Sequence, residues 1–465
     1  MTVLGRFRKK YIGDRAFYRM LMTVAVPIMV QNGITNFVSL LDNIMVGRIG
    51  TEPMSGVAIV NQIMFIYFLC QFGGISGAGI FTAQYYGYKD DEGIRNSFRY
   101  KLWMGLIITA AAICVMHFFG TNLISLFLNE SEGGGDLAAT LRYGLGYMRI
   151  IFLGMPFVFV SFAYSSTLRE CGETMVPMKA GVIAVFVNLA FNYLLIYGKF
   201  GFPKLGVYGA AVATDISRVV ECVIIVGWLH LHSSSHTYIK GLYRTLLIPA
   251  ASVRKFFITG LPILINETLW STGVFLLNQA YSLRGLNAVA GQNIANTINN
   301  LFNISFFALG DAVAIIIGQL LGAGKMEEAK DTDNKIIASS VMIGLAVMVV
   351  TILCAPLFPK LYNTNDEARH LAMLFLIAQA LATPKEAFLH TTYFTIRSGG
   401  KTLITFFFDS FFMCVFSVPV AFVLSRYTDL HVVLIFAVVH AVDLIKCVIG
   451  YILVKKNVWM RNIVK

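Results

Sequence analysis

Charged residues are scarce in this sequence. Only 13% of its 465 residues are Asp, Glu, Lys or Arg, whereas 57% are hydrophobic. A soluble protein of this length could not cover its surface with so few charges. The composition therefore excludes an ordinary soluble enzyme or binding domain and indicates a protein that lies in a membrane.

Cysteine is also sparse. The seven cysteines are scattered through apolar segments, and no Cys-x-x-Cys motif occurs. This pattern predicts neither a disulfide framework nor a zinc site. His230, His232 and His236 lie close together, but no fourth ligand is near them, so we interpret them as part of a polar loop just inside the membrane. We expect no bound cofactor.

The hydrophobic residues that are present form twelve long blocks. Each block has at least the roughly twenty residues that a helix needs to cross a bilayer. The blocks are 17–41, 54–79, 98–120, 142–168, 176–198, 207–230, 254–282, 288–321, 335–360, 370–397, 402–425 and 431–454. They predict an all-α integral membrane protein with twelve transmembrane helices.

Lysine and arginine are distributed unevenly between alternate loops. If the N-terminus is cytoplasmic, 25 of the 37 basic residues fall in the inner segments and nine in the outer ones. This bias follows the positive-inside rule and predicts that both termini are cytoplasmic and that the loop 120–142 is outside. The net charge of +12 then faces anionic lipid, and we expect no nucleic-acid partner.

The two halves of the chain are similar at a constant offset of 235 residues. Without gaps, the alignment pairs Pro27 with Pro262, Asn43 with Asn278, Gln84 with Gln319 and Gly87 with Gly322. Two repeats of six helices must enter the membrane in the same direction. We predict an N-lobe (1–230), a cytoplasmic linker (231–253) and a C-lobe (254–465) around a central cleft, with Pro27 and Pro262 as hinges.

Amide side chains follow one face of the eighth block. Asn293, Asn296, Asn300 and Asn303 are spaced three, four and three residues apart, and Asp311 lies close to the same face. Amides can simply join helices. A stripe that ends in a carboxylate is more typical of a water-lined surface, so we expect these residues to line the cleft. Asn32 and Asn36 in the first block also need solvation.

Seven carboxylates lie at helix depth. They are Asp42, Asp215, Glu267, Asp311, Glu386, Asp409 and Asp443. A basic residue three positions further on can pair with Asp215 (Arg218) and with Asp443 (Lys446).

Asp42 and Glu267 have no basic residue within a turn. Glu386 follows Lys385, but neighbours on a helix point about 100° apart. Because these three acids lack a local partner, they are the candidates to carry H⁺ or Na⁺.

Several motifs resemble those of the multidrug and toxic compound extrusion (MATE) transporters, over nearly the whole chain. "PIMVQNGITNFVSLLDNIMVGRIG" is similar to the family's first helix, and "NETLW" to the seventh helix of its NorM-like branch. The stretch from Asn188 to Thr214 looks like the family's fifth-to-sixth helix signature. "AQYYGYKD" and "GQLLGAGK" look like its repeated Gln-x-x-Gly helix ends.

The resemblance implies an antiporter in the bacterial inner membrane that exports organic, mostly cationic or amphipathic compounds in exchange for H⁺ or Na⁺. It implies coupling roles for Asp42, Glu267 and Glu386, the last lying eleven residues before Arg397. Asn192 stands where the DinF-like branch has an aspartate. We therefore expect a cation site, with Na⁺ as one candidate ion, on Glu267 and Glu386, and Asp311 as a weaker third member. Asn188 and Asn192 are expected in the substrate cleft.

Other functions are compatible with parts of the pattern. A flippase for a lipid-linked or anionic precursor would need rows of basic residues, and only Arg218, Lys385 and Lys446 lie within helices. An intramembrane enzyme is disfavoured because no HExxH motif occurs. A receptor or channel is disfavoured because two repeats suggest rocking lobes. We expect a monomeric transporter of small organic substrates, surrounded by lipid, and not an enzyme.

Overall fold

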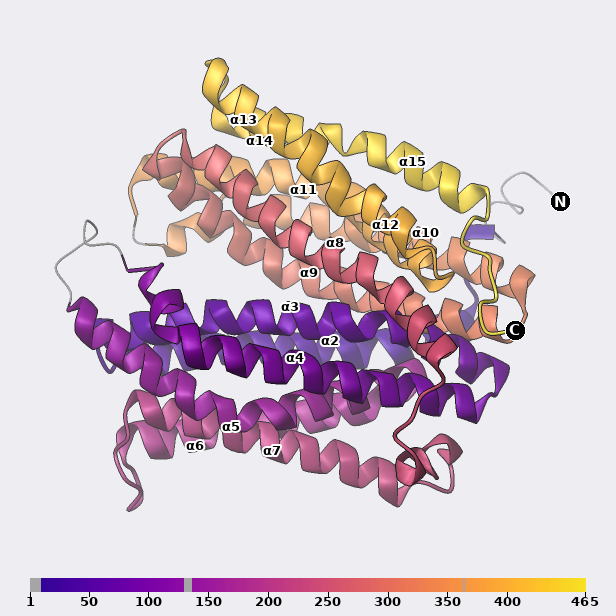
Figure 1. Ribbon diagram of the computed structural model, residues 1–465. Coiled ribbons are helices and arrows are strands. Elements are labelled where there is room, and N and C mark those ends of the chain that lie inside the picture. Colours follow the sequence, from indigo (N-terminus) through magenta and orange to yellow (C-terminus); the bar gives the residue numbers. More distant parts are fainter. Residues whose placement is uncertain (1–9, 129–135, 363) are drawn as a thin grey trace. The chain divides into compact units, whose positions relative to one another are not determined.

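The structure is a computed structural model that describes residues 10–128, 136–362 and 364–465, except the side chains of residues 39 and 40. Most of the predicted outer segment "NESEGGGD" lies outside the described residues. The described chain is helical and contains no strand (Figure 1). Its long helices are α2 (Arg15–Gly47), α3 (Thr51–Tyr88), α4 (Asp91–Ser125), α5 (Leu137–Glu170), α6 (Met175–Tyr197), α7 (Val207–Leu231), α8 (Ala250–Ser282), α9 (Leu286–Gly322), α10 (Met326–Cys354) and α11 (Asp366–Ser398).

The last two predicted blocks each contain more than one helical segment. The eleventh comprises α12 (Thr402–Phe406), two π-helical turns, η4 (Phe407–Phe411) and η5 (Met413–Ser417), and α13 (Val418–Tyr427). The twelfth comprises α14 (Val432–Val442) and α15 (Leu444–Lys455), which are separated at Asp443. Such π turns shift the register of the side chains that follow, and they often occur at functional sites.

The prediction of an all-α membrane protein is confirmed. In the described chain, eleven helical spans are long and apolar enough to cross a bilayer. The remaining predicted block, 207–230, is α7, whose 25 residues would extend about 37 Å. It contains Asp215, Arg218 and Glu221, which reduce its hydropathy. Large apolar side chains such as Phe118 and Leu153 are exposed on these helices, as expected for lipid-facing surfaces.

The described chain separates into two compact units. The N-terminal unit contains residues 30–82 and 90–260, and the C-terminal unit contains the described residues up to 29 together with 83–89 and 261–465. The predicted lobes divide the chain by sequence, whereas these units divide it by packing. Each unit has its own apolar core. Val60 and Met155 are buried in the N-terminal unit, and Phe375 and Ile435 in the C-terminal unit.

Two equivalent glycines meet inside the C-terminal unit. A Cβ atom added to Gly87, at the end of α3, would lie 1.9 Å from the carbonyl oxygen of Gln319 on α9. A Cβ atom added to Gly322 would lie 1.9 Å from the carbonyl oxygen of Gln84 on α3. Only glycine permits so close an approach of two helix backbones. The repeated Gln-x-x-Gly motifs therefore mark a reciprocal crossing of α3 and α9.

The predicted linker packs against α4. It includes two short 3₁₀ turns, η1 (Thr237–Ile239) and η2 (Leu242–Arg244). The Arg99 guanidinium donates to the carbonyl oxygens of Leu242 (3.0 Å) and Gly241 (3.1 Å). The Trp103 indole donates to the carbonyl oxygen of Leu246 at 3.1 Å. These bonds give the segment a defined conformation within the N-terminal unit.

Candidate functional site

In the N-terminal unit, one carboxylate is bound by amides. Asn188 and Asn192 are one turn apart on α6 and both are buried, so they face the same neighbour. Nδ2 of Asn192 donates to Oδ1 of Asp42 on α2 at 2.6 Å. With its amide turned so that nitrogen faces the acid, Asn188 lies 3.0 Å from both oxygens of Asp42. Thr214 on α7 lies 3.3 Å from the Asn188 side chain.

The basic residues near this cluster bind elsewhere. Arg218 pairs with Glu221 at 2.9 Å, so the predicted local pair of Arg218 with Asp215 does not form. Asp215 instead packs against Gly154 on α5, where an added Cβ atom would lie 2.1 Å from its Oδ1. Among the described residues, Asp42 makes no ion pair. In the described part of the chain, Asp42 thus bonds only to neutral amides, while Arg218 lies close enough to influence it electrostatically.

The other polar residues predicted on α2 differ from one another in exposure. Asn32 is half-buried and Asn36 is exposed. Pro27 and Pro262 occupy equivalent positions inside α2 and α8, where each removes a backbone donor from its helix. This is the geometry that a hinge requires, and their hinge role stays a prediction.

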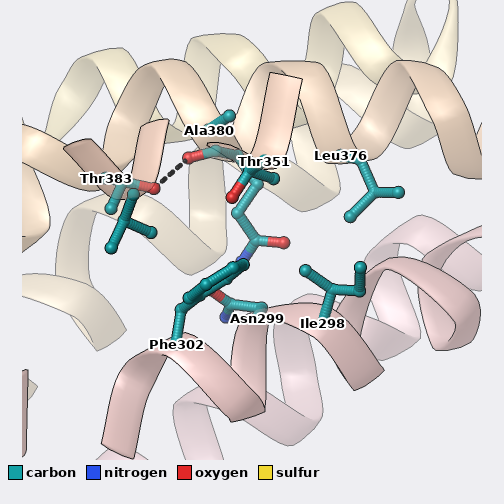
Figure 2. Close-up of a pocket in the computed structure, with 9 residues that line it drawn as sticks. Ile298, Asn299, Phe302, Thr351, Leu376, Ala380 and Thr383 are labelled. Atoms are coloured by element: carbon teal, nitrogen blue, oxygen red, sulfur yellow. Dashed lines mark hydrogen bonds between the residues drawn. The ribbon is translucent and has the colours of Figure 1, made fainter. Parts of the chain in front are cut away.

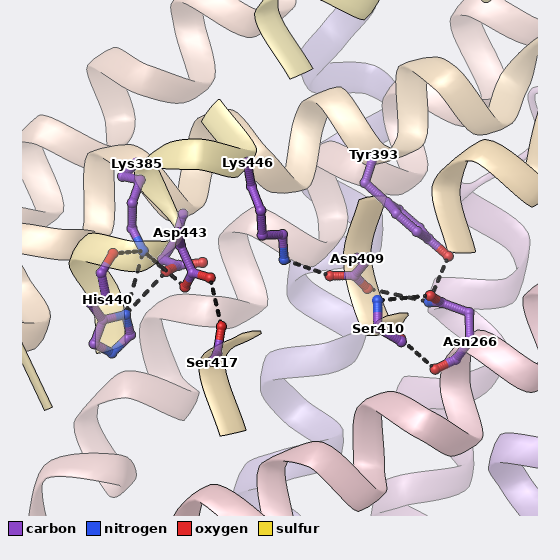
Figure 3. Close-up of polar contacts among 10 residues, drawn as sticks. Asn266, Lys385, Tyr393, Asp409, Ser410, Ser417, His440, Asp443 and Lys446 are labelled. Atoms are coloured by element: carbon purple, nitrogen blue, oxygen red, sulfur yellow. Dashed lines mark hydrogen bonds and ion pairs between the residues drawn. The ribbon is translucent and has the colours of Figure 1, made fainter. Parts of the chain in front are cut away.

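In the C-terminal unit, Asn266 joins α8 to two other spans. Its Nδ2 donates to the hydroxyl of Tyr393 on α11 and to Oδ2 of Asp409 in η4, both at 3.3 Å. The backbone N–H of Ser410 donates to Asn266 Oδ1 at 3.3 Å, and the Ser410 hydroxyl donates to the Asn266 carbonyl at 2.7 Å. The π turn presents both groups of Ser410 to α8 (Figure 3).

Glu267, the next residue on α8, is half-buried. It makes no hydrogen bond or ion pair with any other described residue, although Arg397 and Asp409 lie close enough to influence it electrostatically. Asp409 itself is paired, since Nζ of Lys446 lies 3.1 Å from its Oδ1. Glu267 is therefore the acid of this region that has no ammonium partner.

Glu386 lies in a second cluster, centred on Lys385. Nζ of Lys385 is 2.6 Å from Oε1 of Glu386 and 3.3 Å from Oδ2 of Asp443. It also donates to the carbonyl oxygen of His440 at 3.1 Å, and Ser417 donates to Oδ1 of Asp443 at 3.3 Å (Figure 3). Two sequence-based expectations are therefore corrected. Glu386 does pair with its neighbour Lys385, because the lysine stem is long enough to reach across, and Asp443 does not pair with Lys446.

The structure does not bring Glu267 and Glu386 into contact. Tyr393, whose hydroxyl accepts a hydrogen bond from Asn266 next to Glu267, lies seven residues beyond Glu386 on α11. Seven residues correspond to about 10 Å along a helix. Glu267 and Glu386 share no hydrogen bond or ion pair in the part of the chain that the structure describes.

The amides predicted on α9 are partly accessible. Asn293 and Asn300 are exposed, and Asn296, Asn303 and Asp311 are half-buried. A small, partly open hollow of about 220 Å³ lies beside them, between α9, α10 and α11 (Figure 2). Asn299 and Phe302 line it, and not the predicted stripe. That volume includes open solvent, and the enclosed part, about 10 Å³, has room for about one water molecule, so the hollow is too small for an organic substrate.

Two buried charged groups were not singled out from the sequence. Lys101 on α4 is fully buried and pairs with Glu170 at the end of α5. Asp333 on α10 is buried and accepts a bond from the Thr395 hydroxyl at 2.6 Å. Lys101 and Asp333 lie in the first third of α4 and α10, toward helix ends, where charge is expected on general grounds. Only their burial in the fold distinguishes them from ordinary surface residues.

Comparisons with known proteins agree with the repeat and the motifs. The MatE family matches residues 27–194 and again 262–423, so that its two copies begin 235 residues apart. The probable multidrug resistance protein YoeA of Bacillus subtilis is 26% identical, over 89% of this chain and 88% of its own length. The probable multidrug resistance protein NorM of Thermotoga maritima is 25% identical, over 88% and 86%.

Solved structures support the same fold. A structure of a MOP superfamily transporter from Pyrococcus furiosus superposes with a TM-score of 0.82 at 21% identity, over 98% of both chains. A MATE family transporter described in an outward-facing conformation gives a TM-score of 0.81 at 20% identity, over 98% and 99%. At these identities the structures establish the fold, while the family follows from the sequence match. The chain is therefore a multi-pass membrane transporter of the MatE family.

Proposed function

We propose that this transporter is a secondary active antiporter that exports organic, mostly cationic or zwitterionic amphipathic compounds in exchange for H⁺ or Na⁺. The names of its relatives, multidrug resistance proteins, support a broad range of organic substrates. The single observation that carries the proposal is the amide-bound carboxylate of Asp42. An acid at helix depth with only neutral partners is suited to exchange a proton or a sodium ion.

The candidate coupling acids differ in whether an ammonium group contacts them. Asp42 and Glu267 are without ammonium partners, whereas Glu386 already contacts one in Lys385. We assign ion exchange to Asp42 and Glu267, with Asp311 as an auxiliary acid, and place Glu386 outside the exchange site because Lys385 already neutralises it. Binding of H⁺ or Na⁺ at Asp42 would neutralise its charge and change its bonds to α6, which would bias α2 between two conformations.

Charge pairing favours cationic over anionic substrates. The three basic residues assigned to helix depth from the sequence all contact carboxylates: Arg218 with Glu221, Lys385 with Glu386, and Lys446 with Asp409. A lipid-linked or anionic precursor would need unpaired basic groups for recognition. This argues for export of cations rather than for a flippase.

Reconstitution in proteoliposomes tests the proposal. An imposed pH or Na⁺ gradient should drive efflux of an ethidium-like cationic dye, and the gradient that works identifies the coupling ion. Asp42→Asn should abolish this efflux, with expression and thermal stability nearly unchanged. Asn43→Ala, at the exposed neighbouring position, is the matched control.

Two results would contradict the proposal. Export of anionic dyes alone would exclude the substrate class, and full gradient-driven efflux by Asp42→Asn would exclude the coupling role. Loss of folded Asp42→Asn protein would instead indicate that Asp42 anchors the end of α2.

A further inference from the structure

Three side chains in the C-terminal unit form the outline of a cation site. Glu386 is on α11, His440 is on α14, and Asp443 lies at the break between α14 and α15. One ligand atom from each lies within 4.8 Å of the others. Carboxylate oxygen and imidazole nitrogen are common ligands of metal ions in proteins.

An ammonium already occupies the space between these ligands. Nζ of Lys385 lies 2.6 Å from Glu386 Oε1, 3.3 Å from Asp443 Oδ2, and 3.1 Å from the carbonyl oxygen of His440. It also lies 3.4 Å from Nδ1 of His440. Lysine has three N–H donors, and two carboxylates and one carbonyl satisfy all of them. In Figure 3 the Lys385 nitrogen lies between His440 and Asp443.

The geometry around Lys385 is that of a coordinated cation. Its side chain is only 9% exposed, so few of its contacts are with solvent. A tethered cation competes with a dissolved ion at a high effective concentration, since its binding is intramolecular. The second buried ammonium of this region, Lys446, is occupied by Asp409 and does not compete for these ligands.

We propose that Lys385 is the resident cation of the Glu386–His440–Asp443 cluster, and that it determines ion specificity by excluding Na⁺ and divalent metal ions from it. Ion exchange then takes place at carboxylates that have no ammonium partner, which rests on the proposed function. Removal of the ammonium should convert the cluster into a site for Na⁺ or for a divalent ion that accepts oxygen and nitrogen ligands, such as Mn²⁺.

Binding measurements on the purified full chain test this inference without any transport assay. Lys385→Met keeps the length of the stem and removes the charge. It should gain about one saturable Mn²⁺ site per chain in paramagnetic resonance titrations, and also binding of radioactive Na⁺ above the wild-type level. Adding Glu386→Gln should abolish both gains. Lys446→Met is the matched control and should gain no Mn²⁺ site, because among the described residues no histidine or second acid bonds to Asp409 or pairs with Lys446.

A second arm does not depend on the folding of Lys385→Met. In the wild-type background, Glu386→Gln should leave Na⁺ and Mn²⁺ binding unchanged, because the cluster holds neither ion. The inference is overturned if Glu386→Gln lowers wild-type binding, or if folded Lys385→Met binds no more of either ion than wild type. Failure of the dye efflux assay would refute the proposed function and would leave these binding results unaffected.

Discussion

At the residue scale, charge compensation across helices dominates the C-terminal unit. Lys446 and Asp409 come from different spans, and Lys446 is buried. A buried pair contributes little net stability when intact, but removal of one partner leaves an uncompensated charge. The lysine therefore stabilises the folded state mainly by preventing an uncompensated charge on Asp409.

Lys446→Met should reduce the free energy of unfolding by about 2 kcal/mol, since Asp409 loses the ammonium that it contacts. Thermal unfolding in detergent measures the change. The double variant Lys446→Met/Asp409→Asn should recover most of the stability, because both charges are then removed. Equal loss in the double variant would show that the lysine stem, and not its charge, stabilises this region.

At the element scale, the glycine crossing of α3 and α9 limits which side chains the motif tolerates. An added methyl group would overlap a backbone carbonyl on the other helix at either position. Since backbone cannot rotate away as a side chain can, the helices would have to separate.

Gly87→Ala and Gly322→Ala should each lower stability by about 1–3 kcal/mol through this overlap. Gly227→Ala on α7 is the control, because nothing lies within 4 Å of its added Cβ atom. That change should be neutral or slightly stabilising, as alanine favours a helix over glycine. Thermal unfolding of the three variants checks the prediction, and equal effects of all three would contradict the close crossing.

The linker, which is predicted to lie outside the membrane, offers a pH-dependent element. His236 is buried there, and burial lowers the pKa of its imidazole from the ordinary value, an effect strengthened by His232 and opposed by Glu173. Because the folded pKa is depressed, the unfolded segment binds more protons below about pH 6.5. The packed conformation should lose stability as the pH falls through that range.

Hydrogen exchange of the linker amides over residues 237–244 should therefore accelerate, relative to the intrinsic rate, when the pH falls below about 6.5. His236→Gln, which cannot take up a proton, should abolish this pH dependence. Exchange in α6 serves as an internal reference. A pH-independent protection of the linker in the wild type would refute the prediction.

At the scale of the whole molecule, the charge bias predicts the orientation in the bilayer. Both termini should be cytoplasmic, because the inner segments carry most of the lysine and arginine. A cysteine introduced at Ser131, in the predicted outer loop and outside the described residues, should react with an impermeant thiol reagent in intact cells. A control variant without the native cysteines sets the background. Reaction only after permeabilisation would reverse the predicted orientation.

Much of the fold follows from the sequence. The number, order and approximate limits of the helices depend on runs of apolar residues, which are local properties of the chain. The offset between Pro27 and Pro262 identified the repeat that the family match confirms. The Gln-x-x-Gly pairs were visible as equivalent positions, although their direct contact was not.

Tertiary structure decided which charged groups meet. Local spacing suggested Asp443 with Lys446, but the break at Asp443 and the π turns of the eleventh span change the register there. Asp443 consequently meets Lys385, and Lys446 meets Asp409. Hydropathy and periodicity describe one helix at a time, whereas these pairs depend on the relative rotation and axial shift of neighbouring helices. The sequence alone therefore determined that this chain is a repeated bundle of membrane helices containing buried acids, and packing between helices determined which of those acids have an ammonium partner.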